Sequence, residues 1–319
     1  MVFHAICLSA RMSLEIAISV VMTLIVAATP ILLAGLGELV AEKSGVLNLG
    51  VEGMMLVGAV AGFIAASLSG VTPLGYAVAG IAGLVASLLF AVLALTFRAN
   101  QVATGLALTI FGTGLSSLAG AQFVGTTVRR LGPLFPDGLA SHPILRIVFG
   151  YDVIVYLSVA ATLAVTFFLN HTRRGLILRC VGESDESAHA IGYPVTLIRY
   201  LATAFGGAMA GIAGAYYSLA VTPMWADRIT AGRGWIALAL VVFSSWRPWR
   251  LLLGAYIFGA VMTLELYSKA AGFALLPPEM LAMLPYLATV AALTVIAMRP
   301  SRGRLDAPRC LGKSFQAGG

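Results

Sequence analysis

Long apolar runs, separated by short polar stretches, make up most of this chain. A helix that crosses a hydrocarbon core of about 30 Å needs about 20 predominantly apolar residues. The runs that meet or approach this length are Ser13–Leu36, Val51–Leu68, Leu74–Phe97, Asn100–Gln122, Tyr151–Leu169, Tyr200–Val221, Leu251–Tyr267 and Leu281–Met298. Trp235–Phe243 is apolar but too short, which predicts half a helix. We therefore predict an all-α integral membrane protein, a polytopic bundle of about eight to ten transmembrane helices with broken or re-entrant segments.

The composition supports this class. Of 319 residues, 60% are hydrophobic and only 10% are charged, whereas a soluble domain carries roughly 25% charged residues. So few charges cannot cover a water-facing surface. The net charge of +7 would suggest nucleic acid in a soluble protein, but here the basic residues cluster between and after apolar runs, where they act as topology signals. We expect a multi-pass protein of the cell (inner or plasma) membrane, in contact with membrane lipid and with no nucleic-acid partner.

Three local features predict backbone geometry. Pro30 falls inside the first apolar run and predicts a kink or a break. The pairs Gly58–Gly62 and Gly207–Gly211 each have three residues between the glycines. That spacing lets the backbones of transmembrane helices approach closely.

The longest polar stretch is 171–199, HTRRGLILRCVGESDESAHAIGYPVTLIR. Ser184 is a candidate N-cap with acidic residues in the turn beyond it, and Gly192 and Pro194 follow as stop signals. This pattern favours a short capped helix that docks a partner; a connector without regular structure is the alternative. We place this loop and the basic tail, 299–319, on the cytoplasmic side, which leaves Arg129, Arg130 and Arg146 outside, against the positive-inside rule.

The tail contains a near match to a phosphate-binding P-loop, Ala307–Ser314. That motif needs a leading Gly, whose place Ala307 takes, and a preceding strand, which the sequence does not predict. We therefore expect a disordered basic tail and no ATPase activity in this chain. No HExxH or GxSxG motif occurs, and Cys7, Cys180 and Cys310 are too far apart to suggest a metal pair. We expect no catalytic residue, no metal and no cofactor.

Two Gly-rich segments that contain charges, Glu38–Gly53 and Thr222–Gly234, each follow one apolar helix and lead into another. Interrupted hydrophobic segments in both halves of a transporter indicate a binding site near the membrane midplane, because unwound backbone at that depth must line a cavity or be buried in protein. Two ordinary surface loops are the alternative. The candidate pathway residues are Asn48, Glu52, Asn100, Gln101 and Arg233.

Four tryptophans lie near the ends of apolar runs: Trp225, Trp235, Trp246 and Trp249. They are able to stack on a flat substrate, but Trp at the end of a span more commonly anchors the protein at the membrane interface. We expect anchoring.

Several of these segments resemble a known family. HTRRGLILRCVGESDESAHAIGYPV is similar to the cytoplasmic loop of permease subunits of ATP-binding-cassette (ABC) importers, in the branched-chain amino acid and simple-sugar permease superfamily. Three further segments resemble the subgroup associated with nucleosides and with basic-membrane-protein-type binding lipoproteins. They are LLAGLGELVAEKSGVLNLGVEGMMLVGAVAGF, ANQVATGLALTIFGTGL and AGRGWIALALVVFSSWRPWRLLLGAY. The resemblance runs from about Leu32 to Met298. Cys180, where such loops often have Ala, and the basic pair Arg129–Arg130 are departures.

The resemblance implies roles for two groups of residues. Ser44–Gly53 and Asn100–Thr104 would lie beside the translocation route, which adds Thr104 to the pathway residues. The loop would contain the coupling helix that contacts a separate ATPase. The candidate coupling residues are Gly182, Glu183, Asp185, Glu186, Ala188 and Gly192.

Taken together, residues 1–319 are interpreted as a single transmembrane permease domain, a non-catalytic subunit of an ATP-driven importer of nucleosides or simple sugars. Its expected partners are an ABC ATPase subunit, a second homologous permease in a homodimer or heterodimer, and an extracytoplasmic substrate-binding lipoprotein. The competing interpretation is a stand-alone secondary transporter or channel for a small polar solute. Glu15 and Glu265 are each isolated near a span, whereas ion relays commonly use chains of buried acids.

Overall fold

The computed structural model describes residues 2–135, 143–270 and 307–316, together with the single positions 280, 283, 287, 290 and 294. Its helices are α1 (Val2–Lys43), α2 (Val51–Ser69), α3 (Thr72–Ala91), α4 (Gln101–Gly120), α6 (Pro143–Phe149), α7 (Val153–His171), α8 (Arg173–Glu183), α9 (Asp185–Ala190), α10 (Val195–Tyr216), α11 (Arg233–Phe243) and α12 (Pro248–Ala270). Short turns of π-helix, Val92–Thr96 and Tyr217–Val221, extend α3 and α10.

Seven of the described helices are long and apolar enough to cross a membrane, which confirms the predicted class. They correspond to seven of the runs read from the sequence, with ends that differ by up to seven residues. The remaining run, Leu281–Met298, lies outside the described residues apart from single positions. The short helix α11 coincides with the predicted half helix.

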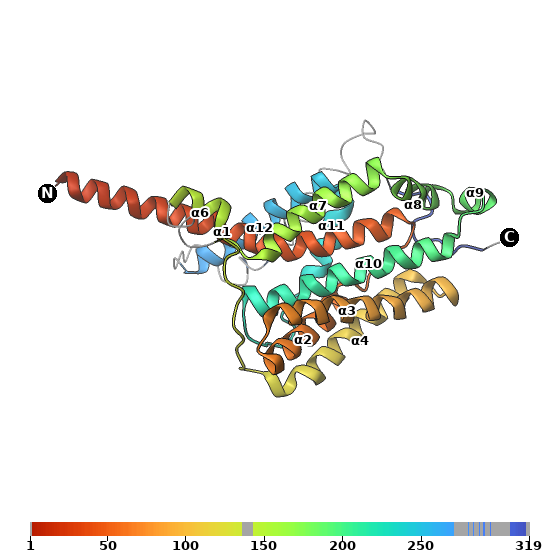
Figure 1. Ribbon diagram of the computed structural model, residues 1–319, viewed down its shortest axis with the longest axis horizontal. Helices are drawn as coiled ribbons and strands as arrows, with labels where there is room; N and C mark the ends of the chain where they lie inside the picture. The colour runs from red at the N-terminus through yellow and green to blue at the C-terminus, as the bar shows by residue number, and fades with distance from the viewer. Residues whose placement is uncertain are drawn as a thin grey trace.

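The long helices lie side by side, and the connections gather at two ends (Figure 1). At one end, called here the α9 end, lie α8, α9 and residues 307–316; α6 lies at the other, the α6 end. The polar loop and the tail therefore share one end. Arg129 and Arg130 lie at the opposite end, where the backbone carbonyl of Arg129 accepts a hydrogen bond from Thr72 and the Arg130 guanidinium donates one to Val221.

Helix α1 is continuous through Pro30, so the predicted break is wrong. It also continues past Glu38 and Glu42 to Lys43, although charge there suggested that the helix ended earlier. Both carboxylates are buried inside the bundle, each 1% exposed. The residues that flank Pro30 are buried too. Packing against α10, α12, α11 and α7 fixes this helix, and tertiary context overrides local propensity.

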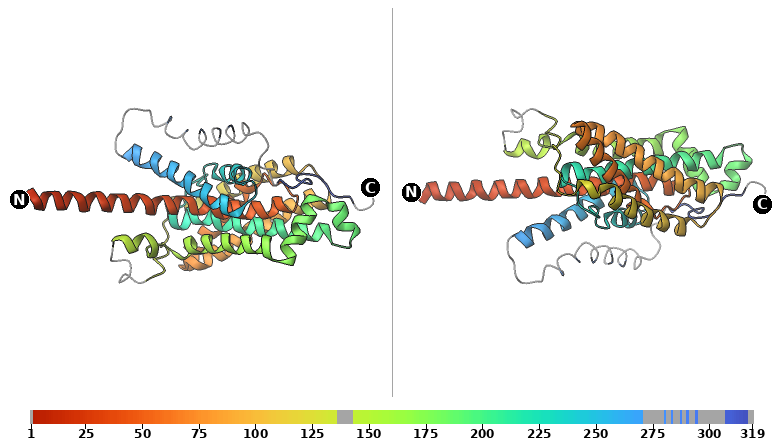
Figure 2. Two further views of the ribbon diagram at one scale, coloured as in Figure 1. Left: turned by 90° about the horizontal axis from the view of Figure 1, so that it is seen from above. Right: turned by 90° about the horizontal axis from the view of Figure 1, so that it is seen from below.

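Helix α10 crosses the centre of the bundle and packs against α3, α1 and α2 (Figure 2). Gly58 of α2 faces Gly211 of α10 so closely that a Cβ on Gly58 would overlap the Gly211 backbone. A Cβ on Gly62 would lie 2.8 Å from the carbonyl oxygen of Gly75 in α3. The close helix approach predicted from the glycine spacing is confirmed.

The segment after α10 crosses the bundle in two unlike parts. Residues 222–232 are non-helical and begin at the α6 end, where Val124 bridges Trp225 and Thr127 bridges Met224. From Gly232, in the left-handed region at φ 79°, the chain enters α11 and returns toward the α9 end. This crossing is therefore a broken one, as the sequence indicated.

The tryptophan prediction is wrong for two of the four residues. Trp225 is 1% exposed and packs against Phe63, with ring centroids 6.1 Å apart. Trp246 is 5% exposed, and its indole N–H donates a hydrogen bond to the Glu42 carboxylate. These rings fill the protein interior. Trp235 and Trp249 are exposed and remain available as interfacial anchors.

We expect Gly58→Ala to lower the thermal stability of the detergent-solubilised protein. The added methyl group has no space against Gly211, and overpacking of this kind costs about 1–3 kcal/mol. Gly114→Ala on α4 is the matched control, because a Cβ there meets no atom within 4 Å. Melting midpoints measured by size-exclusion chromatography after heating provide the test. Equal midpoints for the two variants would contradict the close packing.

Candidate functional site

The two interrupted segments meet at Glu52, in the first turn of α2. One oxygen of its carboxylate accepts hydrogen bonds from the Thr230 hydroxyl at 2.5 Å and the Gly232 N–H at 2.8 Å. The other accepts one from the Gly234 N–H at 2.6 Å. Glu52 is 6% exposed and Thr230 is fully buried. A side chain of the first interrupted segment, Glu52, thus binds the backbone and a hydroxyl group of the second.

The position of this carboxylate has a physical reason. Helix α11 begins at Arg233, inside the bundle, and the first N–H groups of any helix lack an intrahelical acceptor. The same terminus carries a partial positive charge from the helix dipole. The Glu52 carboxylate accepts hydrogen bonds from these N–H groups and its negative charge is stabilised by the helix dipole. Inside a membrane, water is not available to accept these hydrogen bonds. Arg233 is half-buried and places its guanidinium 4.8 Å from the centre of the Tyr217 ring.

Two further predicted pathway residues shape the turn at 44–50. Asn48 accepts the Gly50 N–H at 2.8 Å, while its own N–H donates to Glu38 at 3.1 Å. Gln101 of α4 accepts the Leu47 N–H at 2.8 Å. Asn48 and Gln101 are only 1% and 2% exposed. They therefore satisfy buried backbone donors of the turn.

Asn100 and Thr104 lie elsewhere, at the start of α4. Asn100 is exposed and caps the helix by accepting the Ala103 N–H at 3.0 Å. Thr104 is half-buried, and its hydroxyl donates to the Asn100 carbonyl. The structure thus gathers Glu52 and Arg233 at the α11 terminus, Asn48 and Gln101 at the turn, and these two on α4.

A polar row on α4 was missed by the sequence interpretation. Thr109, Thr113 and Ser117 are half-buried and recur at every fourth residue. Thr109 donates to the Leu49 carbonyl at 3.1 Å, so the row begins beside the 44–50 turn. Ser117 donates to the Asp227 carboxylate at 2.5 Å, so it ends beside the second interrupted segment. The four-residue spacing of hydroxyls in an apolar run was the available signal.

The polar loop forms a capped helix, as predicted. Ser184 is the N-cap of α9 and accepts the Ser187 N–H at 3.3 Å. The chain leaves the helix through Gly192, which has a φ of 90° in the left-handed region. The cap and stop signals in the sequence therefore located α9.

A buried arginine ties this loop to the bundle. Arg199 of α10 is 1% exposed, and its guanidinium donates to the Asp185 carboxylate at 2.9 Å. It also donates to the backbone carbonyls of Ser44 and Lys313, both at 3.2 Å. One side chain thus joins α9, the end of α1, α10 and the tail.

The predicted coupling residues fall into two groups. The members of the first are buried: a Cβ on Gly182 would overlap the Lys43 carbonyl, Asp185 pairs with Arg199, and Ala188 packs with Val181 and Val195. The members of the second are exposed: Glu183, which pairs with Arg309 at 2.7 Å, Glu186 and Gly192. Only the second group is available to a partner. Ile191, next to Gly192, is 71% exposed and was not singled out from the sequence.

The tail is ordered over 307–316, so the expectation of disorder there is wrong. The Cys310 N–H donates to the Gly182 carbonyl at 2.9 Å, and the Gly312 N–H donates to the Gly45 carbonyl at 3.1 Å. The Cys310 thiol donates to Asp185 at 3.4 Å, and burial raises the pKa of this thiol, which keeps the proton on sulfur. The P-loop-like stretch is therefore a strap against the base of the loop.

We expect Glu52→Gln to loosen the start of α11. The amide keeps one oxygen but turns an N–H₂ group toward a backbone N–H, and each hydrogen bond to a charged group contributes about 1.5–3 kcal/mol. Hydrogen exchange of peptides that contain Gly232 and Gly234, followed by mass spectrometry, should be about tenfold or more faster than in the unmodified chain. Glu15→Gln, at an exposed position of α1, is the control. Unchanged exchange in Glu52→Gln would remove the capping role.

Comparison with known proteins places the chain in a family. Residues 20–293 match the family described as branched-chain amino acid transport system / permease component. TsgC13 of Haloferax volcanii, provisionally named a glucose ABC transporter permease, is 39% identical over 91% of this chain and 94% of its own length. The guanosine ABC transporter permease NupQ of Bacillus subtilis is 31% identical over 92% and 95%. The nucleoside ABC transporter permease NupC of Lactococcus lactis is 25% identical over 93% and 96%. The chain therefore belongs to the family of permease components of branched-chain amino acid transport systems, as a multi-pass membrane protein.

Proposed function

We propose that this permease forms, with a second permease, the translocation pathway of an ATP-dependent importer of nucleosides or simple sugars. Separate ATPase subunits would drive it, and an extracytoplasmic lipoprotein would deliver the solute. The proposal is supported by similarity along more than 90% of the chain to permeases named for guanosine, nucleosides and glucose. The structural observation that carries the coupling part of the proposal is the exposed tip of α9 on an anchored base.

The geometry of α9 suits a lever. Its base is held by Asp185 on the buried Arg199, which also contacts Ser44 at the end of α1. Its C-terminal tip carries the exposed side chain of Ile191, and Glu186 is exposed next to Asp185. A displacement of the tip therefore acts on α10 and α1 through short contacts. An ATPase that binds the tip differently in two states would shift the permease between two states by that difference in affinity.

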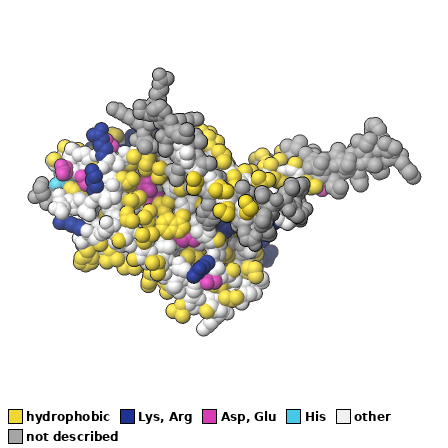
Figure 3. Space-filling view, turned by 180° about the vertical axis from the view of Figure 1, so that it is seen from behind, with side chains coloured by type: hydrophobic (Ala, Val, Ile, Leu, Met, Phe, Trp, Pro, Cys, Tyr) yellow, Lys and Arg dark blue, Asp and Glu magenta, His cyan; other side chains and the backbone are white. Residues whose placement is uncertain are grey.

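The distribution of charge supports a cytoplasmic position for the α9 end. Lys and Arg are retained on the cytoplasmic side of membrane proteins. Figure 3 shows basic side chains gathered at this end, while hydrophobic side chains cover much of the flank. The described basic residues there include Lys43, Arg98, Arg173, Arg174, Arg179, Arg247, Arg250, Arg309 and Lys313.

The chemistry of the interior favours an uncharged solute rich in hydroxyl groups. The Glu52 carboxylate already accepts three hydrogen bonds from Thr230, Gly232 and Gly234. The hydroxyl groups of the row on α4, Thr109, Thr113 and Ser117, donate within the protein, and their neutral oxygens can still accept hydrogen bonds. The hydroxyl groups of ribose or glucose could donate to such acceptors.

We expect ATP-dependent uptake of a nucleoside or glucose by liposomes that contain this chain, its partner permease, the ATPase and the binding protein. Competition by unlabelled guanosine, glucose and leucine should identify the substrate class, with leucine inactive. Liposomes with this chain alone and a sodium or proton gradient are the control. Uptake by the chain alone would instead indicate a secondary transporter, and competition by leucine alone would overturn the substrate class.

We expect Ile191→Asp to abolish binding of the ATPase while the melting midpoint of the permease stays unchanged, because the side chain is exposed and touches no core. Ile191→Leu should retain binding. Asp185→Asn should instead lower the melting midpoint of the permease, since loss of one partner from a buried ion pair costs about 3–5 kcal/mol. Co-purification and thermal unfolding measure the two effects. Full ATPase binding by Ile191→Asp would rule out the tip as the docking point.

A further inference from the structure

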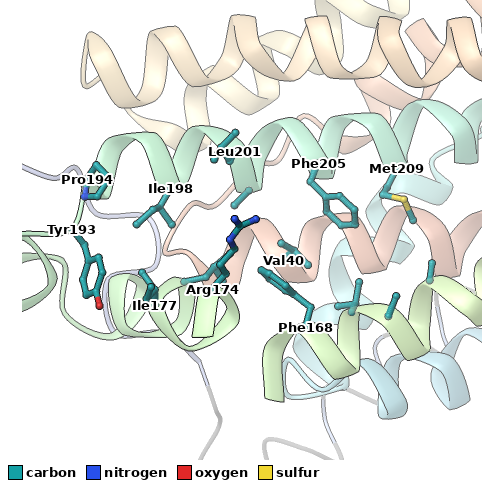
Figure 4. Close-up of a pocket in the computed structure, with 15 residues that line it drawn as sticks. Val40, Phe168, Arg174, Ile177, Tyr193, Pro194, Ile198, Leu201, Phe205 and Met209 are labelled. Atoms are coloured by element: carbon teal, nitrogen blue, oxygen red, sulfur yellow. The ribbon is translucent and has the colours of Figure 1, made fainter. Parts of the chain in front are cut away.

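An apolar groove runs along the bundle between α7 and α10, apart from the two interrupted segments. Its volume is about 630 Å³, α1 forms its floor, and α8 borders its α9 end, which we call the mouth (Figure 4). Apolar side chains make up almost all of its lining, among them Val40, Phe168, Ile198, Leu201, Phe205 and Met209. Leu201 and Phe205 are 64% and 38% exposed, so the groove is open along its side.

The length of the groove matches one leaflet of a bilayer. On α10 its lining extends from Ile198, close to the start of the span at Val195, to Met209. At 1.5 Å per residue these positions are about 16 Å apart along the helix axis. Half of a hydrocarbon core of about 30 Å is about 15 Å. The groove thus begins near the membrane boundary at the α9 end and stops near the midplane.

A single cation lies at the mouth. Arg174 extends from α8 toward α10, with its guanidinium on the side of Leu201, whereas Tyr193 lies farther toward the α9 end (Figure 4). Among the residues that the structure describes, Arg174 makes no hydrogen bond or ion pair, whereas Arg199 nearby has acceptors on each of its three nitrogens. A guanidinium binds phosphate oxygens in a two-pronged geometry. The α9 end of the groove therefore offers one cation to an anion.

We propose that this groove binds an anionic phospholipid from the leaflet at the α9 end, with an acyl chain along α7 and α10 and the phosphate on Arg174. Charge complementarity at the mouth and the one-leaflet length favour a lipid over a helix of a second protein. A transmembrane helix would need a face along the whole bundle, whereas this lining ends at Met209.

The position of the lipid suggests a mechanical role. Arg174 belongs to the first turn of α8, which leads directly into α9. A phosphate held there, with its acyl chain against α10, would brace α8 on the transmembrane bundle. The lipid would then hold the base of the coupling loop in addition to its protein contacts at Arg199 and the tail.

Native mass spectrometry of the purified chain tests the proposal without any transport step, so its outcome is independent of the proposed function. The probes are 1-palmitoyl-2-oleoyl phosphatidylglycerol and the phosphatidylcholine with the same chains. We expect one phosphatidylglycerol to remain bound and phosphatidylcholine to bind more weakly. Arg174→Gln should weaken phosphatidylglycerol binding about tenfold or more, the effect of losing charged hydrogen bonds, whereas Arg174→Lys should retain part of the binding because it keeps the charge but not the two-pronged geometry.

Two further variants separate the groove from general surface charge. Arg173→Gln removes an adjacent exposed cation that does not line the groove and should leave binding unchanged. Ala164→Trp fills the groove and should displace the lipid; its melting midpoint checks folding, and Arg174→Gln carries the test if it does not fold. Equal retention of phosphatidylglycerol by Arg174→Gln and the unmodified chain would overturn the proposal. So would a dimer that Ala164→Trp dissociates, since a second copy would then occupy the groove.

Discussion

Backbone N–H and C=O groups inside a hydrocarbon core have no water to bind, and this bundle is built around the places where its helices break. The start of α11 has N–H groups without intrahelical partners, and the Glu52 carboxylate accepts two of them. The turn at 44–50 is held in the same way by Asn48, Gln101 and Glu38. Each break is therefore paired with a buried polar side chain from another helix.

The rest of the bundle is held together by close helix packing. Glycines on α2, α3 and α10 bring the three backbones into contact, and membrane helices associate through packing because lipid tails are as apolar as their side chains. This three-helix unit supports one side of the broken crossing, and α1 and α12 support the other. The interrupted segments thus lie between two groups of packed helices.

The contacts of the polar loop, 171–199, distinguish the residues that hold it in place from those that are exposed. Asp185 is directed inward to Arg199, Ala188 is packed, and Gly182 leaves room for the Lys43 carbonyl. These residues hold the loop against the bundle, so a substitution at any of them would disturb its base and leave its exposed side chains in place. The exposed side chains are Glu186, next to Asp185, and Ile191, at the C-terminal tip of α9. The ordered tail contacts the same base, through Arg199 and Gly182.

The sequence by itself determined the class, the seven described spans, the half helix, the cap of α9 and the glycine contacts. These depend on local pattern: apolar length, cap chemistry, and residues too small to separate two backbones. The tertiary structure decided whether a polar residue faces outward or inward. Glu38 and Glu42 continue α1 because partners from distant positions receive them. The strap at 307–316 is ordered because Arg199, Gly182 and Gly45 bind its backbone. A local sequence pattern does not contain these pairings, because in several of them the donor and the acceptor are more than a hundred positions apart.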